Sequence, residues 1–355
     1  MRIILIHVII DTFGFSHIMK KILIIALASV LSACAQDSSN EVNLYSARQE
    51  ALMQPLLEAF TKESGIKVNL ISSKADALLT RIESEGANSP ADLLLTTDAG
   101  RLHRAKEAGI FATINSERLN TSIPQNYRDQ DNQWFGLSLR ARPIMVTKAA
   151  ALDTVTSYED LAKPELAGQI CIRSSGNIYN QSLIASMIDN QGEADAEAWA
   201  TGLVANLARK PQGGDRDQIR AAAAGQCSIV VANTYYLANM LSNEKKSDDF
   251  AAASQMTVIW PNQSDRGTHV NVSGAGVLKA AKNKDNAIKL IEFLASDTAQ
   301  EMYANVNFEY PVKSGVKLNP ILSKWGNFKA DPIALNKLGL NNAAAVKLMD
   351  RAGWK

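Results

Sequence analysis

The chain has 355 residues, of which 37 are basic and 36 acidic, so its formal net charge is only +1. Removal of residues 1–33 on export would take away three basic residues and one acidic residue, which leaves the mature chain close to neutral. This balance gives no reason to expect a nucleic-acid partner, and the remaining length suits two α/β lobes better than one small core.

Residues 1–40 have the pattern of an export signal followed by a short tether. A basic start at Met19, a candidate for the true initiator, precedes an apolar stretch too short to cross a bilayer as a helix. Two interpretations of the cleavage site stay open. Residues 31–34 (LSAC) are similar to the lipobox of bacterial lipoproteins, in which Cys34 would be acylated, whereas the small residues at 33 and 35 also suit ordinary cleavage. The polar tether favours the lipoprotein, and both interpretations predict a periplasmic protein.

The first part of the mature chain alternates between short apolar strands and amphipathic helices. We expect strands over residues 42–45, 66–71 and 91–95, and helices over 50–64, 75–86 and 98–108. The helix over 50–64 has apolar residues at helical spacing and stops at Gly65. Such alternation is typical of a parallel sheet with helices on both faces.

A second α/β set begins after residue 136. Its expected strands cover residues 137–147, 169–172 and 227–232, and its expected helices 157–161, 180–191, 194–208 and 215–224. A glycine-rich segment at 270–278 then leads the chain back toward the first α/β set. Residues 285–304 are predicted to form one amphipathic helix.

The mature chain has few side chains for imidazole or thiolate chemistry. Its histidines are His103 and His269, and neither is near a nucleophile motif, so the sequence does not predict an enzyme. Zinc and related ions favour imidazole and thiolate ligands, which are scarce here. Cys171 and Cys227 either pair, as an oxidising compartment would allow, or stay two separate buried thiols.

Polar segments follow four of the predicted strands, at residues 45–50, 96–98, 173–182 and 233–236. Ligands of open α/β sheets bind beyond the carboxyl ends of the strands. The last segment contains the adjacent Tyr235 and Tyr236. A phenolate is a hard oxygen donor that suits Fe³⁺, and a bound trivalent cation can remove the proton that a free tyrosine keeps to about pH 10. The dipeptide alone would equally suit an aromatic pair packed on a helix.

These segments carry a resemblance to the ferric-iron substrate-binding proteins of bacterial ABC importers, and the resemblance covers nearly the whole mature chain. Its most specific pieces are residues 43–48 (NLYSAR), 93–102 (LLLTTDAGRL), 172–183 (IRSSGNIYNQSL) and 233–236 (NTYY). It implies the two-lobed type 2 periplasmic binding fold, with each lobe a mainly parallel sheet flanked by helices and the ligand in the cleft between them. It also implies a monomer that binds ferric ion and delivers it to an ABC permease in the inner membrane.

The resemblance further implies how the chain is divided. Residues 1–40 are the signal segment and tether. Residues 41–138 together with about 270–318 form the N-lobe, and residues 139–269 together with about 319–355 form the C-lobe.

The family's tyrosinate ligands map onto Tyr235 and Tyr236, and a third maps onto Tyr179. Many relatives carry His-Tyr after the first Tyr-Ser-x-Arg, but this chain has Gln49 and Glu50 there. Glu50 is either an iron ligand or simply the start of a helix, where acids are favoured. If Glu50 only starts a helix, the first lobe supplies the metal with a synergistic anion, with water or with no ligand at all.

Three phenolates would balance Fe³⁺, and a synergistic anion such as carbonate would need its own cations. Arg140 is the first candidate to face it, followed by Arg48 and Arg142. Arg48 has two structural alternatives, a pair with Asp98, which is another residue of the predicted ligand site, or an interaction with a helix C-terminus. Ser174 is expected near the start of a helix whose amides would face an anion.

Tyr45 fits two descriptions equally well, a residue next to the ligand or a core aromatic. The alternative function is the binding of a small oxyanion or organic acid, which the serines and arginines would suit but three convergent tyrosines would not.

Overall fold

The computed structural model describes residues 40–150, 154–243 and 247–355. The predicted initiator Met19 and the acylation site Cys34 lie outside the described residues. Within the described part, no helix is long and apolar enough to cross a membrane.

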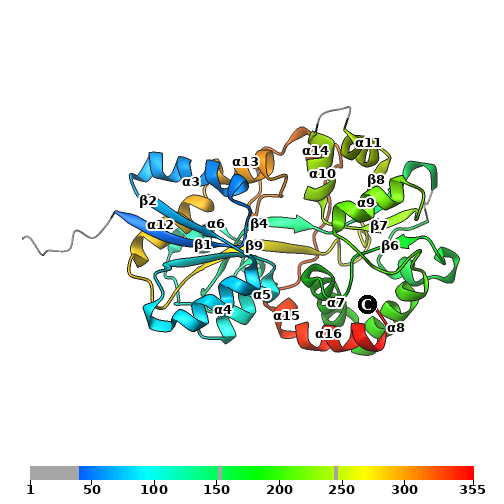
Figure 1. Cartoon of the computed structure of the whole chain (residues 1–355), viewed down its shortest axis with the longest axis horizontal. Helices are drawn as coiled ribbons and strands as arrows, with labels where there is room; N and C mark the ends of the chain where they lie inside the picture. The colour runs from blue at the N-terminus through cyan, green and yellow to red at the C-terminus, as the bar shows by residue number, and fades with distance from the viewer. Residues whose placement is uncertain (1–39, 151–153, 244–246) are drawn as a thin grey trace, which may run out of the picture. The chain divides into compact units, whose positions relative to one another are not determined.

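One lobe, which we call the N-lobe, is built on a five-stranded sheet in the order β2-β1-β3-β9-β4 (Figure 1). Its strands are β1 (Glu41–Ser46), β2 (Lys67–Ser72), β3 (Leu93–Thr97), β4 (Phe135–Ala141) and β9 (Val270–Val277). β1 pairs in parallel with β2 and β3, whereas β9 runs antiparallel to both β3 and β4. β3, β4 and β9 are buried along their whole length, as expected for strands covered on both faces.

The other lobe, which we call the C-lobe, has a four-stranded sheet in the order β6-β7-β5-β8. Its strands are β5 (Ile144–Thr147), β6 (Ile170–Cys171), β7 (Ile229–Val231) and β8 (Met256–Ile259). β6 and β7 are parallel, and β5 runs antiparallel to both β7 and β8. In each lobe, therefore, a single strand of the sheet runs against the others.

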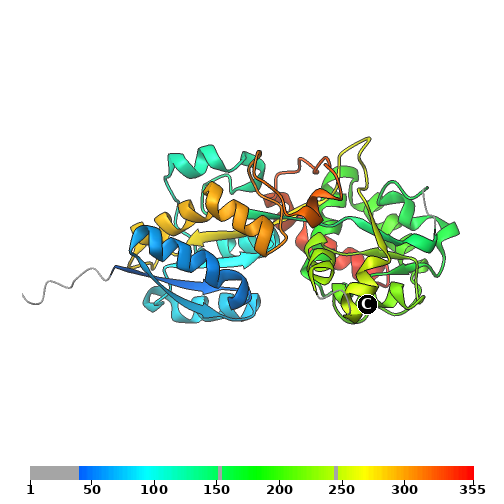
Figure 2. The same cartoon turned by 90° about the horizontal axis from the view of Figure 1, so that it is seen from above.

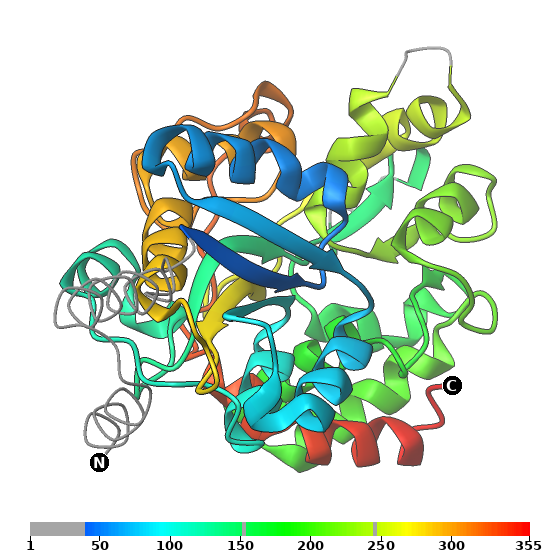
Figure 3. The same cartoon turned by 60° about the vertical axis from the view of Figure 1, so that its left-hand side comes forward.

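Helices cover both faces of each sheet, and Figure 3 shows this most clearly for the N-lobe. The N-lobe helices are α3 (Glu50–Ser64), α4 (Ala75–Glu85), α5 (Ala99–Glu107), α6 (Glu117–Ser122), α12 (Lys284–Leu294) and α13 (Asp297–Val306). The C-lobe helices are α7 (Ile178–Gln191), α8 (Glu193–Ala205), α9 (Asp215–Ala223), α10 (Thr234–Ser242) and α11 (Asp248–Ser254). The C-terminal helices are α14 (Pro320–Ser323), α15 (Asn336–Leu340) and α16 (Asn342–Arg351).

The two lobes are joined by chain segments that cross between them (Figure 2) and by a helical contact. α15 packs against α5 of the N-lobe and also against α7 of the C-lobe. Gly339 permits this approach, because a Cβ atom there would lie 2.2 Å from the Cβ of His103. The lobes therefore meet through buried packing as well as through the connecting chain.

Two predicted elements were wrong in extent. The strand expected over residues 137–147 is divided into β4 and β5, because Pro143 lies between them and has no N–H to donate to a ladder. The helix expected over residues 285–304 is divided into α12 and α13, because the Ser296 hydroxyl accepts from the amide of Ala299 and starts a new helix. Of the two interpretations of the cysteines, the disulfide is the one observed, between Cys171 and Cys227.

Candidate metal centre

A cavity of about 180 Å³ is lined by residues of both lobes. Its N-lobe wall includes Arg48, Gln49 and Asn307, and its C-lobe wall includes Tyr179, Tyr235 and Tyr236. A larger cavity of about 470 Å³ lies between α4, α5 and the segment after β9, but it is lined mainly by small and aliphatic residues and by no tyrosine. The smaller, more polar cavity is therefore the candidate site.

The three tyrosines reach the cavity because each lies in the first turn of a helix that follows a C-lobe strand. Asn177 caps the start of α7, its side chain accepting from the backbone amide of Tyr179, and α10 begins at Thr234, shortly after the end of β7. The hydroxyl of Tyr235 donates to that of Tyr179 over 3.4 Å, and the Tyr235 and Tyr236 rings are 4.2 Å apart. No cluster of three or more His, Cys, Asp or Glu side chains that could hold a metal occurs in the described part of the chain.

Arg140, at the end of β4, makes the environment of Tyr179 electropositive. It donates to the Tyr179 hydroxyl over 3.1 Å and to the Glu309 carboxylate over 3.0 Å. Burial opposes ionisation of Tyr179, but Arg140 and the hydrogen bond from Tyr235 favour its phenolate, so its pKa lies below the ordinary 10.0. Tyr179 is thus the phenol most ready to lose its proton.

The other two phenols hold their protons more firmly. Burial, followed by the neighbouring Tyr179 and Tyr236, raises the pKa of Tyr235 well above 10.0. Burial and Tyr179 likewise raise the pKa of Tyr236 to about 12. A cation that binds both oxygens must therefore displace protons, which a trivalent metal ion can do.

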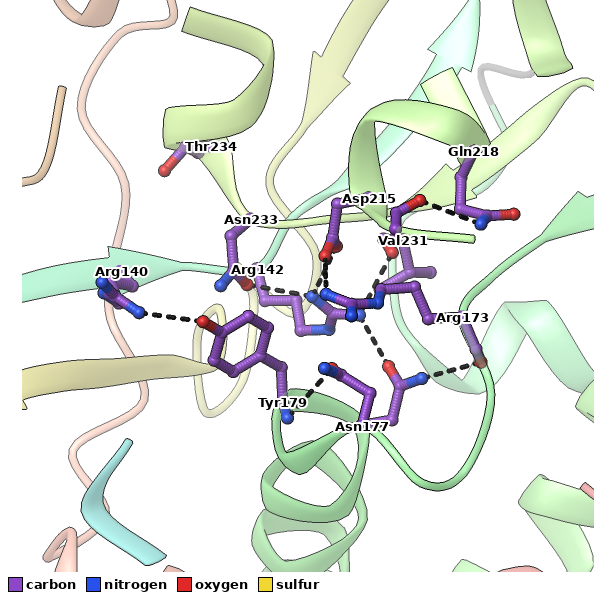
Figure 4. Close-up of polar contacts among 12 residues, drawn as sticks. Arg140, Arg142, Arg173, Asn177, Tyr179, Asp215, Gln218, Val231, Asn233 and Thr234 are labelled. Atoms are coloured by element: carbon purple, nitrogen blue, oxygen red, sulfur yellow. Dashed lines mark hydrogen bonds and ion pairs between the residues drawn. The ribbon is translucent and has the colours of Figure 1, made fainter. Parts of the chain in front are cut away.

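Arg142 is buried next to Tyr179, and both of its terminal nitrogens donate to protein acceptors (Figure 4). Its guanidinium donates to Asp215, Asn233 and Asn180 over 3.1, 3.0 and 2.6 Å. Asn233 directly precedes α10, and Asn180 is next to Tyr179, so this one side chain fixes both helix starts that present tyrosines. Arg140 faces the cavity, whereas Arg142 positions its walls.

A family model described as bacterial extracellular solute-binding protein matches residues 88–330 of this chain. The chain belongs to this family. Iron uptake protein A1 from Synechocystis sp. is 47% identical over 339 residues, which cover 92% of this chain and 94% of that relative. The Fe(3+)-binding periplasmic protein of Serratia marcescens is 28% identical over 335 residues, which cover 93% of this chain and 96% of that relative.

Solved structures of similar proteins share the fold. A Trichodesmium protein in complex with iron and citrate ligands is 51% identical with a TM-score of 0.86, covering 89% of this chain and 100% of that chain. The ferric binding protein from Campylobacter jejuni is 40% identical with a TM-score of 0.83, covering 88% of this chain and 100% of that chain. The predicted two-lobed α/β fold is confirmed, and so is the prediction of a solute-binding protein and not an enzyme.

Four of the predicted ligand residues of this solute-binding protein do not line the cavity, namely Glu50, Tyr45, Ser174 and Asp98. Glu50 is exposed as the first residue of α3, and its neighbour Gln49 lines the cavity instead. Tyr45 is buried in the N-lobe core, where its hydroxyl donates to the Glu85 carboxylate over 3.0 Å. Ser174 lies in the loop before α7, and the side chain that caps this helix is that of Asn177.

Arg48 and Asp98 do not pair with each other. Arg48 lines the cavity and donates to the Glu309 carboxylate over 2.6 Å. Asp98 is fully buried with a φ of 81°, where it caps α5 and accepts from the Ser182 hydroxyl of α7 over 2.7 Å. Asp98 therefore joins the two lobes and does not reach the cavity wall.

Several cavity residues have no signal in the sequence. Arg216 of α9 lies over the Tyr236 ring, 5.3 Å from its centre, and donates to Asn239. Asn307 and Glu309 follow α13, far along the chain from the other site residues. None of these follows a predicted strand, so the rule that located the tyrosines could not find them.

Proposed function

We propose that this solute-binding protein captures ferric iron in the periplasm and delivers it to an ABC permease in the inner membrane. The observation that carries the proposal is the convergence of Tyr179, Tyr235 and Tyr236 on one cavity. Phenolates are hard anionic donors, and three of them balance the charge of Fe³⁺. The relatives that are named as iron uptake and Fe(3+)-binding proteins support the same cargo.

The transport cycle that we propose follows from the two-lobed architecture. Residues 41–138 with about 270–318 would move as one lobe, and residues 139–269 with about 319–355 as the other, closing over the cargo by hinge bending. A synergistic anion such as carbonate would complete the metal's ligands. The protein would act as a monomer, tethered through an acylated Cys34 if the leader is processed as a lipoprotein.

The test is an absorption titration of the purified mature protein with ferric citrate, for wild type and for Tyr235→Phe/Tyr236→Phe. We expect a broad visible phenolate-to-iron band in wild type and its loss in the double variant. Tyr127→Phe is the matched control, because Tyr127 is half-buried against the N-lobe core and does not line the cavity. This variant should keep the band.

A second candidate cargo is a small oxyanion or organic acid, which is favoured by the arginines Arg48, Arg140 and Arg216 in the same cavity. If wild type shows no band and retains no iron after desalting, the iron proposal is wrong and this candidate takes its place. Retention of the band in the double variant would also contradict tyrosinate ligation.

A further inference from the structure

The two lobes touch on the side of β4 and β9 that lies away from the cavity. The cavity is lined in part by residues of α3, α10 and α13, which lie above these two strands in Figure 1. α5, α7 and α15 lie below the strands in the same view. We call the packing of α5 against α15 the rear contact, because it joins the lobes on the side opposite to the cavity.

α15 is fixed to the C-lobe by hydrogen bonds. The side chain of Asn341, which ends α15, donates to the carbonyl of Ala185 in α7 over 3.2 Å. Shortly before α15, Asp331 accepts from the side chains of Ser186 and Asn190 of the same helix, over 3.0 and 3.1 Å. If the rear contact opens, α15 therefore stays with α7 and separates from α5.

Toward the N-lobe, α15 depends mainly on close packing. Gly339 faces His103 of α5, and a Cβ atom at position 339 would overlap with the His103 side chain. Leu338 beside it is completely buried. The amide of Leu335 also donates to the carbonyl of Asn126 over 3.0 Å. Such packing is satisfied only within a narrow range of distances between the two helices, because protein interiors are dense and deform little.

A buried pivot lies between the cavity and the rear contact. Asp98 accepts from the Ser182 hydroxyl of α7 over 2.7 Å and from the Asn271 side chain of β9 over 2.9 Å. Thr97, one residue before Asp98, and Tyr179, three residues before Ser182, both line the cavity. α5 and α7 continue from this pivot to the rear contact. A rotation about the pivot that brings the cavity walls together must therefore draw α5 away from α15.

In this structure the rear contact is formed, whereas the cavity walls are not joined to each other. Among the described residues, no hydrogen bond links Arg48, Gln49 or Asn307 of the N-lobe wall to Tyr236 or Arg216 of the C-lobe wall. The geometry is that of a lever with one side engaged.

We propose that the rear contact opposes closure of the cavity, so that its strength helps to set how tightly iron is held and how fast it is released. This inference rests on the proposed function and names what regulates its site. Closure over the ferric ion would break the packing of α5 on α15, and re-formation of that packing would favour opening and release. A contact that never touches the metal would then change the affinity through the balance of open and closed states.

Gly339→Ala is the test variant, because the added methyl group forces α5 and α15 apart. Alanine suits the position in other respects, since it lies in a helix and alanine is the better helix former. Gly202→Ala is the matched control. It adds the same methyl group to a helical glycine that packs closely on Ala162, but both residues lie within the C-lobe. Gly339→Ala/His103→Gly is the rescue variant, because it makes room for the methyl group.

The readouts are the radius of gyration of the iron-free protein, from small-angle X-ray scattering, and the rate of iron loss to a chelator. In Gly339→Ala we expect the radius of gyration to fall toward that of iron-loaded wild type. Iron loss should slow by about tenfold, the effect that overpacking by one methyl group typically has on an equilibrium. The rescue variant should return both readouts toward wild type. Gly202→Ala should lower the unfolding temperature and leave both readouts unchanged.

His103→Ala tests the same contact without adding any atoms. It removes part of the packing on α15, so it should change both readouts in the same direction as Gly339→Ala, and it replaces that variant if Gly339→Ala does not fold.

The proposal would be overturned by a wild-type radius and wild-type iron loss in the variants at the rear contact. Faster iron loss would overturn it too, because the rear contact would then support closure. Equal changes in Gly202→Ala would trace the effect to lower stability and not to the lobes. Failure of the proposed function looks different: wild type then has no visible band with ferric ion, whereas the radius of iron-free Gly339→Ala still differs from that of wild type.

Discussion

At the level of single residues, the three phenols of the site are not equivalent. Arg140 donates to Tyr179, whose pKa lies below 10.0 despite the burial that opposes its ionisation, whereas burial raises the pKa values of Tyr235 and Tyr236. Tyr179 would therefore offer the first phenolate to an arriving ferric ion. Its charge would then help the ion to displace the other two protons.

Replacement of Arg140 by Met tests this order by removing the charge while keeping a similar length. We expect the pKa of Tyr179 to rise and ferric affinity at neutral pH to fall by about ten- to hundredfold, because one pKa unit is worth about 1.4 kcal/mol. Glu309 keeps its ion pair with Arg48 at 2.6 Å, so the buried carboxylate is not left without a cation. Competition with a chelator measures the affinity.

Arg140→Lys is the control, since it keeps the charge and should lose less affinity than Arg140→Met. The proposed role of Arg140 would be wrong if Arg140→Met bound iron as tightly as wild type and with the same pH dependence. A fall in affinity without any change in pH dependence would indicate that Arg140 acts by packing and not by charge.

Sequence reasoning located the residues that directly follow strands and missed those that arrive by long-range packing. Tyr179, Tyr235, Tyr236 and Arg48 lie in segments that follow predicted strands, and the structure brings them to one cavity. Glu309 joins them only because the chain returns to the N-lobe, 261 residues after Arg48. No local pattern marks such a contact.

At the level of elements, prediction succeeded where the local signal was strong. The helix expected over residues 50–64 has the observed bounds of α3, because Gly65 ends it in the left-handed conformation. Prediction failed where apolar residues keep their helical spacing across a short interruption of the helix, as at Ser296 between α12 and α13. Whether the cysteines pair could not be predicted, because their distance depends on the packing of β6 beside β7.

The disulfide between Cys171 and Cys227 should contribute substantially to C-lobe stability. It closes a loop with a sequence separation of 56 residues that contains α7, α8 and α9. We expect Cys171→Ala/Cys227→Ala to lower the free energy of unfolding by about 4 kcal/mol, the loss of loop-closure entropy for a loop of this size. Urea unfolding of the double variant and of wild type measures this difference.

Wild type treated with a reductant is the matched control and should unfold at nearly the same urea concentration as the double variant. The visible iron band should persist in the folded variant, because neither cysteine lines the cavity. Identical unfolding midpoints for oxidised and reduced wild type would contradict the predicted contribution.

At the level of the whole molecule, the two lobes are joined through a buried network at the crossing strands. The amide of Arg142 donates to the carbonyl of His269 over 3.1 Å, and the Tyr158 hydroxyl donates to the carbonyl of Arg142 over 2.7 Å. The amide of His269 in turn donates to the Tyr158 oxygen over 3.2 Å. A charge introduced at this junction would disturb both lobes at once.

His269 is the titratable group at that junction, and it should make the protein sensitive to acid. Burial, followed by Arg142 and Arg266, lowers its pKa to about 3. An unfolded histidine binds a proton near pH 6.5, so between about pH 6.5 and 3 the unfolded state holds one proton more than the folded state. Through this group alone, stability should fall by about 1.4 kcal/mol for each pH unit as the pH drops through that window.

His269→Gln should remove this component of the pH dependence. The difference in unfolding free energy between variant and wild type should then change by about 1.4 kcal/mol per pH unit below pH 6.5 and stay constant above it. Urea unfolding at a series of pH values measures the slope. His103→Gln is the control, because burial also lowers the pKa of His103 but this residue is only half-buried, so its effect should be smaller. An unchanged slope in His269→Gln would mean that the junction can accept the imidazolium, and the acid sensitivity would then have to come from the carboxylates.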